Sequence, residues 1–299
     1  MAPAARRFEA ERLAGTLPPL LLAALQVAAT MTPGVHGRRR SGLGDSFWQF
    51  RHYQPGDPAR AIDWRRSARA DPVFVRENEW EAAQSVWLWR DASPSMRWRS
   101  HRNLPEKEQR AALLLLALAA LLLRGGEQVA LLGDGAPGRG GGTLTRLAQT
   151  LALEERRAAR SAEDGKGAGL PPTQALPRHS QLILIGDFLA PLSEVEAALR
   201  PFAAGAVRGH LLQVLDPAEE ALPMSGRVRF EGMEGEGELL VRRVERLRPD
   251  YRQRMAAQKA GLTALARQFG WTFATHHTDK APQAALLALH AALSLAPEA

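Results

Sequence analysis

From about residue 85 onward, short apolar runs alternate with longer runs that have helical periodicity. Apolar runs such as Ser85–Trp89 and Gln181–Ile185 predict buried strands, and Glu106–Arg124 predicts a buried helix. The same pattern predicts strands at 128–132, 210–215 and 271–275, and helices at 144–157, 193–202, 250–269 and from 281 onward. Because the strands are apolar throughout and alternate with helices, we expect an α/β fold with a mainly parallel sheet and helices on both faces.

The first 83 residues have a different texture. The stretch up to about Thr30 predicts a small N-terminal helix that ends before Pro33. Residues 42–81 combine aromatic residues, turn signals and charges, and predict a β-rich segment with short strands at 47–53 and 73–76. We therefore divide the chain into residues 1–83, with the helix and the β-rich segment, and residues 84–299, with the α/β domain. Residues 227–230 and 238–242 predict a hairpin appended to that domain.

Composition and charge exclude several classes of function. The chain has no cysteine, which excludes disulfides, thiolate zinc sites and cysteine nucleophiles. The net charge of +7 suggests nucleic-acid binding at first, but the basic residues are dispersed, and Arg38–Arg40 is the only run of three. Because a nucleic-acid footprint requires basic residues that cluster on one face, we expect no nucleic-acid partner.

Two apolar stretches are too short for a bilayer. Leu17–Ala29 is interrupted by Pro18 and Pro19, and Leu113–Leu123 is about half of the roughly 20 residues that a transmembrane helix needs. The charged N-terminus does not have the pattern of a secretory signal. We therefore expect a soluble, cytoplasmic protein with no transmembrane segment.

Candidate chemistry is concentrated at the ends of two predicted strands. Asp91 directly follows one strand and Asp187 follows another, and a parallel sheet brings such strand ends to one ligand-binding edge. The spacing Asp91-x-Ser93-x-Ser95 offers one carboxylate and two hydroxyls from one loop, the oxygen ligands that Mg²⁺ or Mn²⁺ prefers. The structural alternative is an ordinary turn in which Ser93 or Ser95 caps the following helix.

The chain resembles the bacterial family called domain of unknown function 58, over about Leu17 to Phe188. The motifs that carry the resemblance are 44–47 (GDSF), 51–57 (RHYQPGD), 60–64 (RAIDW), 67–69 (SAR), 75–77 (VRE) and 91–96 (DASPSM). The resemblance implies a von Willebrand A-like, Rossmann-type domain with a metal-ion-dependent adhesion site. It also implies Asp91, Ser93 and Ser95 as metal ligands and Asp187 as the late acidic ligand. A threonine completes such sites, and both Thr143 and Thr173 qualify.

The resemblance further implies a non-enzymatic module that works with a MoxR-type AAA+ ATPase in the assembly or maturation of proteins. Its bound Mg²⁺ would capture an acidic residue presented by a protein partner. Two alternatives stay open: a metal-dependent phosphohydrolase, against which we weigh the lack of a phosphate-clamping lysine near the loop, and a scaffold with a metal-free site. The signature block Gly44–Glu77 is either an internal salt-bridge network or a docking surface.

Overall fold

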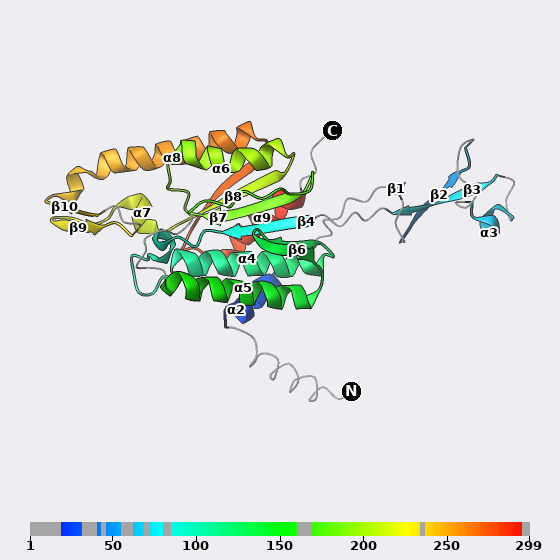
Figure 1. The fold of residues 1–299 in the computed structure, drawn as a ribbon, viewed down its shortest axis with the longest axis horizontal. Coiled ribbons are helices and arrows are strands. Elements are labelled where there is room, and N and C mark those ends of the chain that lie inside the picture. The colour runs from blue at the N-terminus through cyan, green and yellow to red at the C-terminus, as the bar shows by residue number, and fades with distance from the viewer. Residues whose placement is uncertain are drawn as a thin grey trace, which may run out of the picture. The chain divides into compact units, whose positions relative to one another are not determined.

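The computed structural model describes residues 19–31, 41–42, 46–54, 62–68, 72–79, 85–160, 169–233 and 237–294. The chain divides into two compact units (Figure 1). One contains Met1–Gly34 and Ser85–Ala299, and the other contains Val35–Gln84. From the sequence we grouped the N-terminal helix with the β-rich segment, in residues 1–83. The structure instead packs that helix, α2 (Pro19–Ala29), against α4 (Lys107–Arg124) in the first.

The larger unit is built on a six-stranded sheet. Its strands, in spatial order, are β11 (Thr272–His277), β8 (Arg208–Leu215), β7 (Gln181–Gly186), β4 (Ser85–Arg90), β5 (Gln128–Leu131) and β6 (Asp134–Gly138). All neighbours are parallel except β6, which pairs with β5 in the antiparallel direction at one edge. The prediction of an α/β fold with a mostly parallel sheet is therefore confirmed.

Helices cover both faces of this sheet, and each strand supplies both cores. Val86 and Leu88 of β4 pack with α2, α4, α5 (Gly141–Arg160) and α9 (Pro282–Ser294), whereas Trp87 and Trp89 pack with α6 (Leu192–Ala204) and α8 (Arg248–Gln268). Side chains alternate between the faces of a strand, so an apolar run buries both sides. Helix α4 is buried on nearly all sides beneath α2, α5 and α9, which explains its continuous run of Leu and Ala (Figure 1). Among the described residues, no helix has both the length and the hydropathy needed to cross a membrane.

Several short elements were not predicted from the sequence, among them β6, η2 and α7 in the larger unit. Strand β6 lies in a glycine-rich stretch that resembles a turn, yet it pairs with β5 as an edge strand, where glycine and proline are tolerated. The 3-10 helix η2 (Pro94–Arg97) and helix α7 (Pro217–Ala221) are each about one turn long, too short for periodicity to reveal. The predicted hairpin is present as β9 (Val228–Glu231) and β10 (Glu238–Val241).

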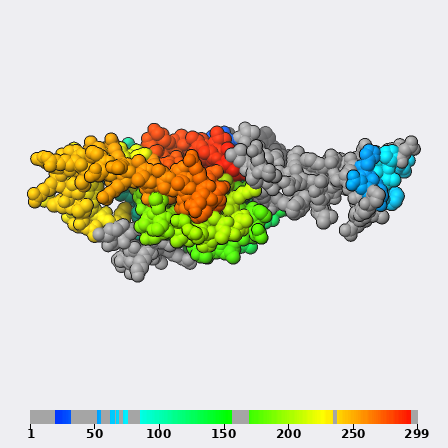
Figure 2. Space-filling model, turned by 90° about the horizontal axis from the view of Figure 1, so that it is seen from above, coloured from blue at the N-terminus to red at the C-terminus, as the bar shows by residue number. Residues whose placement is uncertain are grey.

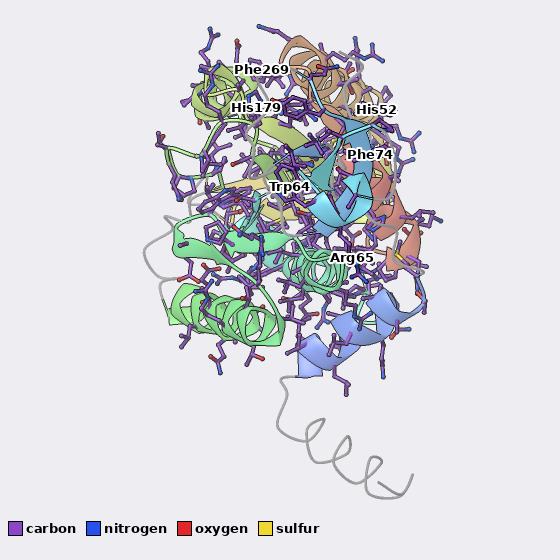
Figure 3. All side chains as sticks on the ribbon, turned by 90° about the vertical axis from the view of Figure 1, so that its right-hand side faces the viewer. His52, Trp64, Arg65, Phe74, His179 and Phe269 are labelled. Carbon is purple, nitrogen blue, oxygen red and sulfur yellow. The ribbon has the colours of Figure 1, made fainter. Side chains whose placement is uncertain are left out.

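The smaller unit contains a three-stranded antiparallel sheet. Its strands lie in the order β1 (Ser41–Gly42), β3 (Phe74–Glu79) and β2 (Ser46–His52), and a short helix, α3 (Trp64–Ser67), precedes β3. The rings of His52 and Phe74 stack with their centroids 5.0 Å apart (Figure 3). The Phe74 amide donates to the Ser67 hydroxyl at 2.9 Å. Most of the charged side chains in the signature block lie outside the described residues, so its two interpretations stay predictions.

Histidine 210 lies on β8 inside the sheet. Its Nε2 is 3.1 Å from Gln181 Oε1, and its Nδ1 is 2.8 Å from the Thr272 hydroxyl. Because Gln181 uses its amide nitrogen to donate to the Leu293 carbonyl, its oxygen accepts, and we assign the proton of His210 to Nε2. Burial, with a smaller contribution from Arg208, lowers the pKa of His210 from 6.5 to about 4. The folded state therefore holds this imidazole neutral.

We predict that stability falls as the pH drops from about 6.5 to about 4, because the unfolded chain then protonates His210 while the folded chain does not. Through His210, the free energy of unfolding at pH 4.5 should be roughly 2 kcal/mol lower than at pH 7. Urea unfolding of wild type and His210→Gln at both pH values measures it. A variant whose loss of stability between the two pH values equals that of wild type would contradict the assignment.

Candidate metal centre

The site lies where the strand order of the sheet reverses. From β4 the chain crosses to β5 on one side, and β7 pairs with β4 on the other side, with Arg90 opposite Ile185. Asp91 and Asp187 immediately follow these two neighbouring strands, and the Asp91 amide donates to the Ile185 carbonyl at 2.8 Å. In open α/β sheets the carboxyl ends of the strands at such a reversal form the usual ligand-binding crevice.

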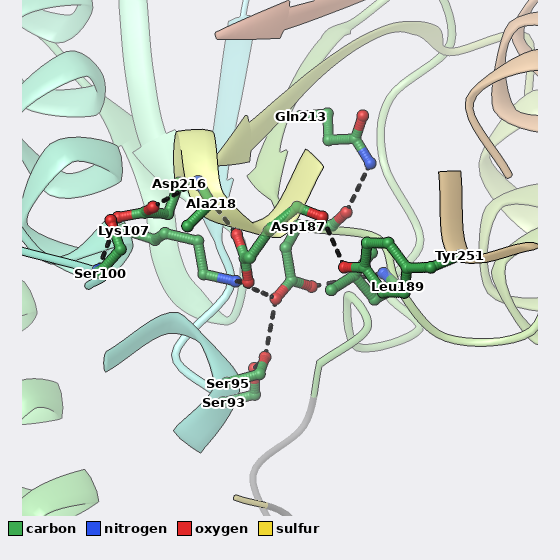
Figure 4. A network of polar contacts seen from close by, with 11 residues as sticks. Ser93, Ser95, Ser100, Lys107, Asp187, Leu189, Gln213, Asp216, Ala218 and Tyr251 are labelled. Carbon is green, nitrogen blue, oxygen red and sulfur yellow. Dashed lines mark hydrogen bonds and ion pairs between the residues drawn. The ribbon is translucent and has the colours of Figure 1, made fainter. Parts of the chain in front are cut away.

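The four residues singled out from the sequence, Asp91, Ser93, Ser95 and Asp187, form one polar cluster. Figure 4 shows Ser93, Ser95 and Asp187 of this cluster. Asp91 Oδ1 accepts from the Ser93 amide at 2.7 Å, and the Ser93 and Ser95 hydroxyl oxygens are 3.0 Å apart. The Ser95 hydroxyl donates to Asp187 Oδ2 at 2.8 Å. Ser93 lies at the N-cap position of η2 but makes no side-chain capping bond there. The two hydroxyls therefore serve the cluster rather than the helix cap that the structural alternative required.

Three of the four residues in the cluster are buried, and the fourth is partly exposed to solvent. Asp91 is 1% exposed, Ser93 0% and Asp187 4%, whereas Ser95 is half-buried. Two glycines allow the chain to pass close to Asp91. A Cβ on Gly186 would lie 2.9 Å from Asp91 Cβ, and a Cβ on Gly169 would lie 3.8 Å from Asp91 Oδ2. The carboxylate of Asp91 is thus enclosed by backbone.

The two candidate threonines lie at opposite ends of the parallel strands, Thr143 at the amino ends and Thr173 at the carboxyl ends. Thr143 donates to the Arg139 carbonyl at 3.0 Å and lies beside Gly138, which is opposite Val129 near the amino end of β5. Thr173 is exposed and precedes Gln174, whose side-chain oxygen accepts from the Gly133 amide beyond the carboxyl end of β5. Only Thr173 therefore lies at the edge that holds Asp91.

Lysine 107 completes the cluster and was missed by sequence reasoning. It is the first residue of α4 and is 0% exposed, and its ammonium is 2.9 Å from Asp187 Oδ2 and 2.5 Å from Glu219 Oε1 (Figure 4). Glu219 belongs to α7, where its other oxygen accepts from the Asp216 amide at 2.8 Å. A usable signal was present, because the helix that follows β4 must begin at the same edge as Asp91.

Lys107, Asp187 and Glu219 do not balance one another in charge. Burial by itself lowers the pKa of Lys107, but attraction to Asp187 and then to Glu219 outweighs it, so that the pKa lies above its usual value. Burial raises the pKa of Glu219, against the lowering effect of Lys107. One ammonium shared between two carboxylates leaves these three residues with a formal charge of −1 when all are ionised.

Arginine 90 is the other cation next to the site in sequence. Strand alternation predicts that its side chain points away from Asp91, and the structure agrees. The side chain of Arg90 is 1% exposed, and its guanidinium lies 2.6 Å from Glu108 Oε1 of α4. Arg90 is therefore committed to the opposite side of the loop and does not oppose a cation at Ser93 and Ser95.

The donor set fits a hard divalent cation. Two carboxylates and two hydroxyls supply only oxygen, which suits Mg²⁺ or Mn²⁺. Because the Ser95 hydroxyl donates its hydrogen bond to Asp187, its oxygen keeps lone-pair density for a ligand contact. Within the described ranges there is no cluster of three or more His, Cys, Asp or Glu side chains that could hold a metal. A cation here would depend on the serines.

Comparisons with known proteins give a family match. The family described as "Protein of unknown function DUF58" matches residues 49–261. Uncharacterized proteins of Mycobacterium bovis (Mb1516) and Mycobacterium tuberculosis (Rv1480) are each 28% identical over 281 residues, covering 90% of this chain and 86% of the relative.

Two solved structures are also similar over much of their length. They are the conserved hypothetical protein BatB from Bacteroides thetaiotaomicron and an aerotolerance-related membrane protein from Bacteroides fragilis. Both are 15% identical to this chain, with TM-scores of 0.36 and 0.38. The alignments cover 71% of this chain and 97% of the first, and 70% of this chain and 98% of the second.

The two glycines around Asp91 give a matched prediction. Gly186→Ala forces a methyl group to 2.9 Å from Asp91 Cβ, which backbone or side chain must relieve, and we expect a loss of about 1–3 kcal/mol in the free energy of unfolding. Among the described residues, Gly169→Ala meets only ordinary contacts of 3.7–3.8 Å, and we expect it to stay within about 0.5 kcal/mol of wild type. Urea denaturation compares the two, and equal losses would show that Asp91 is not held as described.

Proposed function

We propose that this chain, which belongs to the family of proteins of unknown function DUF58, is a non-enzymatic protein-binding module that uses a divalent cation. In this proposal its larger unit is a von Willebrand A-like domain, and Asp91, Ser93 and Ser95 hold Mg²⁺ or Mn²⁺. The observation that carries the proposal is the continuous set of contacts from Ser93 through Ser95 to Asp187 at the reversal of strand order.

Each residue has a role that its contacts support. A bound Mg²⁺ would supply an open coordination position for a carboxylate of the partner. Asp91 fixes the loop, because it accepts from the Ser93 amide. Asp187 accepts the hydrogen bond of the Ser95 hydroxyl, which leaves the lone pairs of that oxygen available to the cation. Ser95, the half-buried member, lies where a partner side chain would enter.

A cavity beside the loop offers room for a partner. It has a volume of about 890 Å³ and is bordered by Pro94, Trp98, Glu219, Phe230 and Tyr251, among other residues. Pro94 separates the two serines in sequence, so the cavity and the candidate centre share a wall. The hairpin and the start of α8 form one end of the larger unit (Figure 2). Leu239, Leu240 and Met233 of this hairpin are 62%, 49% and 41% exposed, so this end of the unit presents several apolar side chains that a partner could cover.

The phosphohydrolase alternative is weaker in view of Lys107. A lysine that clamps a phosphate must present its ammonium to the ligand, whereas Lys107 is wholly buried and shared between Asp187 and Glu219. The same observation favours a second candidate, a scaffold with a metal-free site, because the ammonium already compensates Asp187. Metal binding by the wild-type protein decides between this scaffold and the metal-dependent module.

We predict that the wild-type protein binds one Mg²⁺ or Mn²⁺ and that Asp91→Asn and Ser95→Ala each weaken binding at least tenfold. Asp134→Asn is the matched control, because Asp134 lies on the edge strand β6 and contacts Thr150 rather than the centre. Isothermal titration calorimetry measures the affinities. Absence of binding by wild type would refute the metal-dependent module and leave the scaffold.

The resemblance suggests a MoxR-type AAA+ ATPase as companion, and we include it in the proposal. We predict that the purified ATPase from the same organism, or a client protein delivered by it, is retained by the immobilised chain in Mg²⁺. Retention should fall at least tenfold in EDTA or with Asp91→Asn, since both remove the cation that would receive the partner's carboxylate. Retention that is the same in all three conditions contradicts capture through the metal.

A further inference from the structure

We propose that Lys107 is a resident counter-cation of the candidate centre and sets how tightly the centre binds a divalent cation. The inference rests on the proposed function in one respect, namely that a cation binds at the loop of Asp91, Ser93 and Ser95. It goes further because it assigns the control of affinity to a residue outside that loop, on α4.

The position of Lys107 is unusual for a lysine. Its side chain is 0% exposed, and its ammonium joins carboxylates from two separate elements, Asp187 after β7 and Glu219 on α7. Fully buried lysines are rare unless they are paired. Among the described residues, Lys107 is the only cation within ion-pair distance of Asp187, while Arg90 and Arg97 are directed to Glu108. Asp187 therefore has its positive charge supplied from within the chain.

Lys107 and the loop compete for one oxygen atom. Asp187 Oδ2 accepts from Ser95 at 2.8 Å and from Lys107 at 2.9 Å, so the ammonium and the serine that would bind the cation meet at the same atom. A divalent cation on Ser95 is then held close to a fixed positive charge in a buried setting, where like charges repel strongly. The ammonium also occupies an oxygen that the cation could otherwise use.

This arrangement has a functional consequence. With Asp187 held by Lys107, the loop alone binds a cation weakly, and a carboxylate from outside contributes a large share of the binding. Affinity for the cation and affinity for an acidic partner are then linked, as thermodynamic reciprocity requires. Lys107 would thereby keep the affinity of the centre for the divalent cation low until an acidic partner binds.

A merely structural role for Lys107 gives a different expectation. If the lysine only neutralises two buried carboxylates, its removal lowers stability and leaves metal affinity unchanged or weaker. Our inference requires the opposite change, a gain in affinity. A gain is not a usual result of damage to a fold, so the direction of the change separates the two roles.

The experiment compares three variants with wild type by calorimetric titration with Mg²⁺ alone, after circular dichroism has verified folding. Lys107→Met removes the ammonium. Lys107→Met combined with Glu219→Gln removes one carboxylate as well, so that the three positions keep the formal charge of −1 found in wild type. Lys259→Met is the control, because it also removes an ammonium 2.5 Å from a glutamate, Glu220, but at a pair without contact to Asp187.

We expect the single and the double variant to bind Mg²⁺ at least tenfold more tightly than wild type, and Lys259→Met to bind as wild type does. A gain in the single variant alone would trace the effect to overall charge and overturn the role of the contact with Asp187. Affinities no tighter than wild type in both variants also overturn the inference. If wild type does not bind Mg²⁺ but both variants do, this inference stands and the proposed metal-dependent function of the wild-type protein fails.

Discussion

The parallel pairing of β4 with β7 is the constraint on which the rest of the site depends. It places residue 90 opposite residue 185 and brings the loops after both strands to the same edge of the sheet. Because the chain crosses from β4 to one side and returns through β7 on the other, no further strand separates these loops. Asp91 and Asp187 are 96 positions apart in sequence, yet Ser95 links their loops by a hydrogen bond.

The cores on the two faces of the sheet fix this pairing. Alternate residues of β4 enter two separate hydrophobic clusters, so a shift of the strand by one residue would exchange their contents. Val86 and Leu88 pack in the cluster that contains α4, whereas Trp87 and Trp89 pack in the cluster that contains α6 and α8. Packing therefore holds the ends of β4 and β7 in register, and this register fixes the relative positions of Asp91 and Asp187.

At the candidate centre, hydrogen bonds and ion pairs offset the free-energy cost of removing charged groups from water. Burying Lys107 and the carboxylates of Asp187 and Glu219 removes each from water, which costs free energy that only close pairing offsets. The short helix α7 contributes to this pairing, because its capping box positions Glu219. Lys107 thus joins the start of α4, the end of β7 and α7 around the candidate centre.

Much of this organisation was determined by the sequence. Apolar runs predicted the strands, and their alternation with helices predicted a parallel sheet. In such a sheet the positions directly after the strands, which include Asp91 and Asp187, lie at one edge. Alternation likewise directed Arg90 away from Asp91. Strand β6 was not predicted, because its glycine-rich sequence lacks the apolar alternation of a strand and only pairing with β5 makes it one. The tertiary structure alone decided that Lys107 meets Asp187 and that Thr173, not Thr143, shares the edge of the site. Those outcomes depend on distances between segments far apart in the chain, and periodicity within one segment carries no information about such distances.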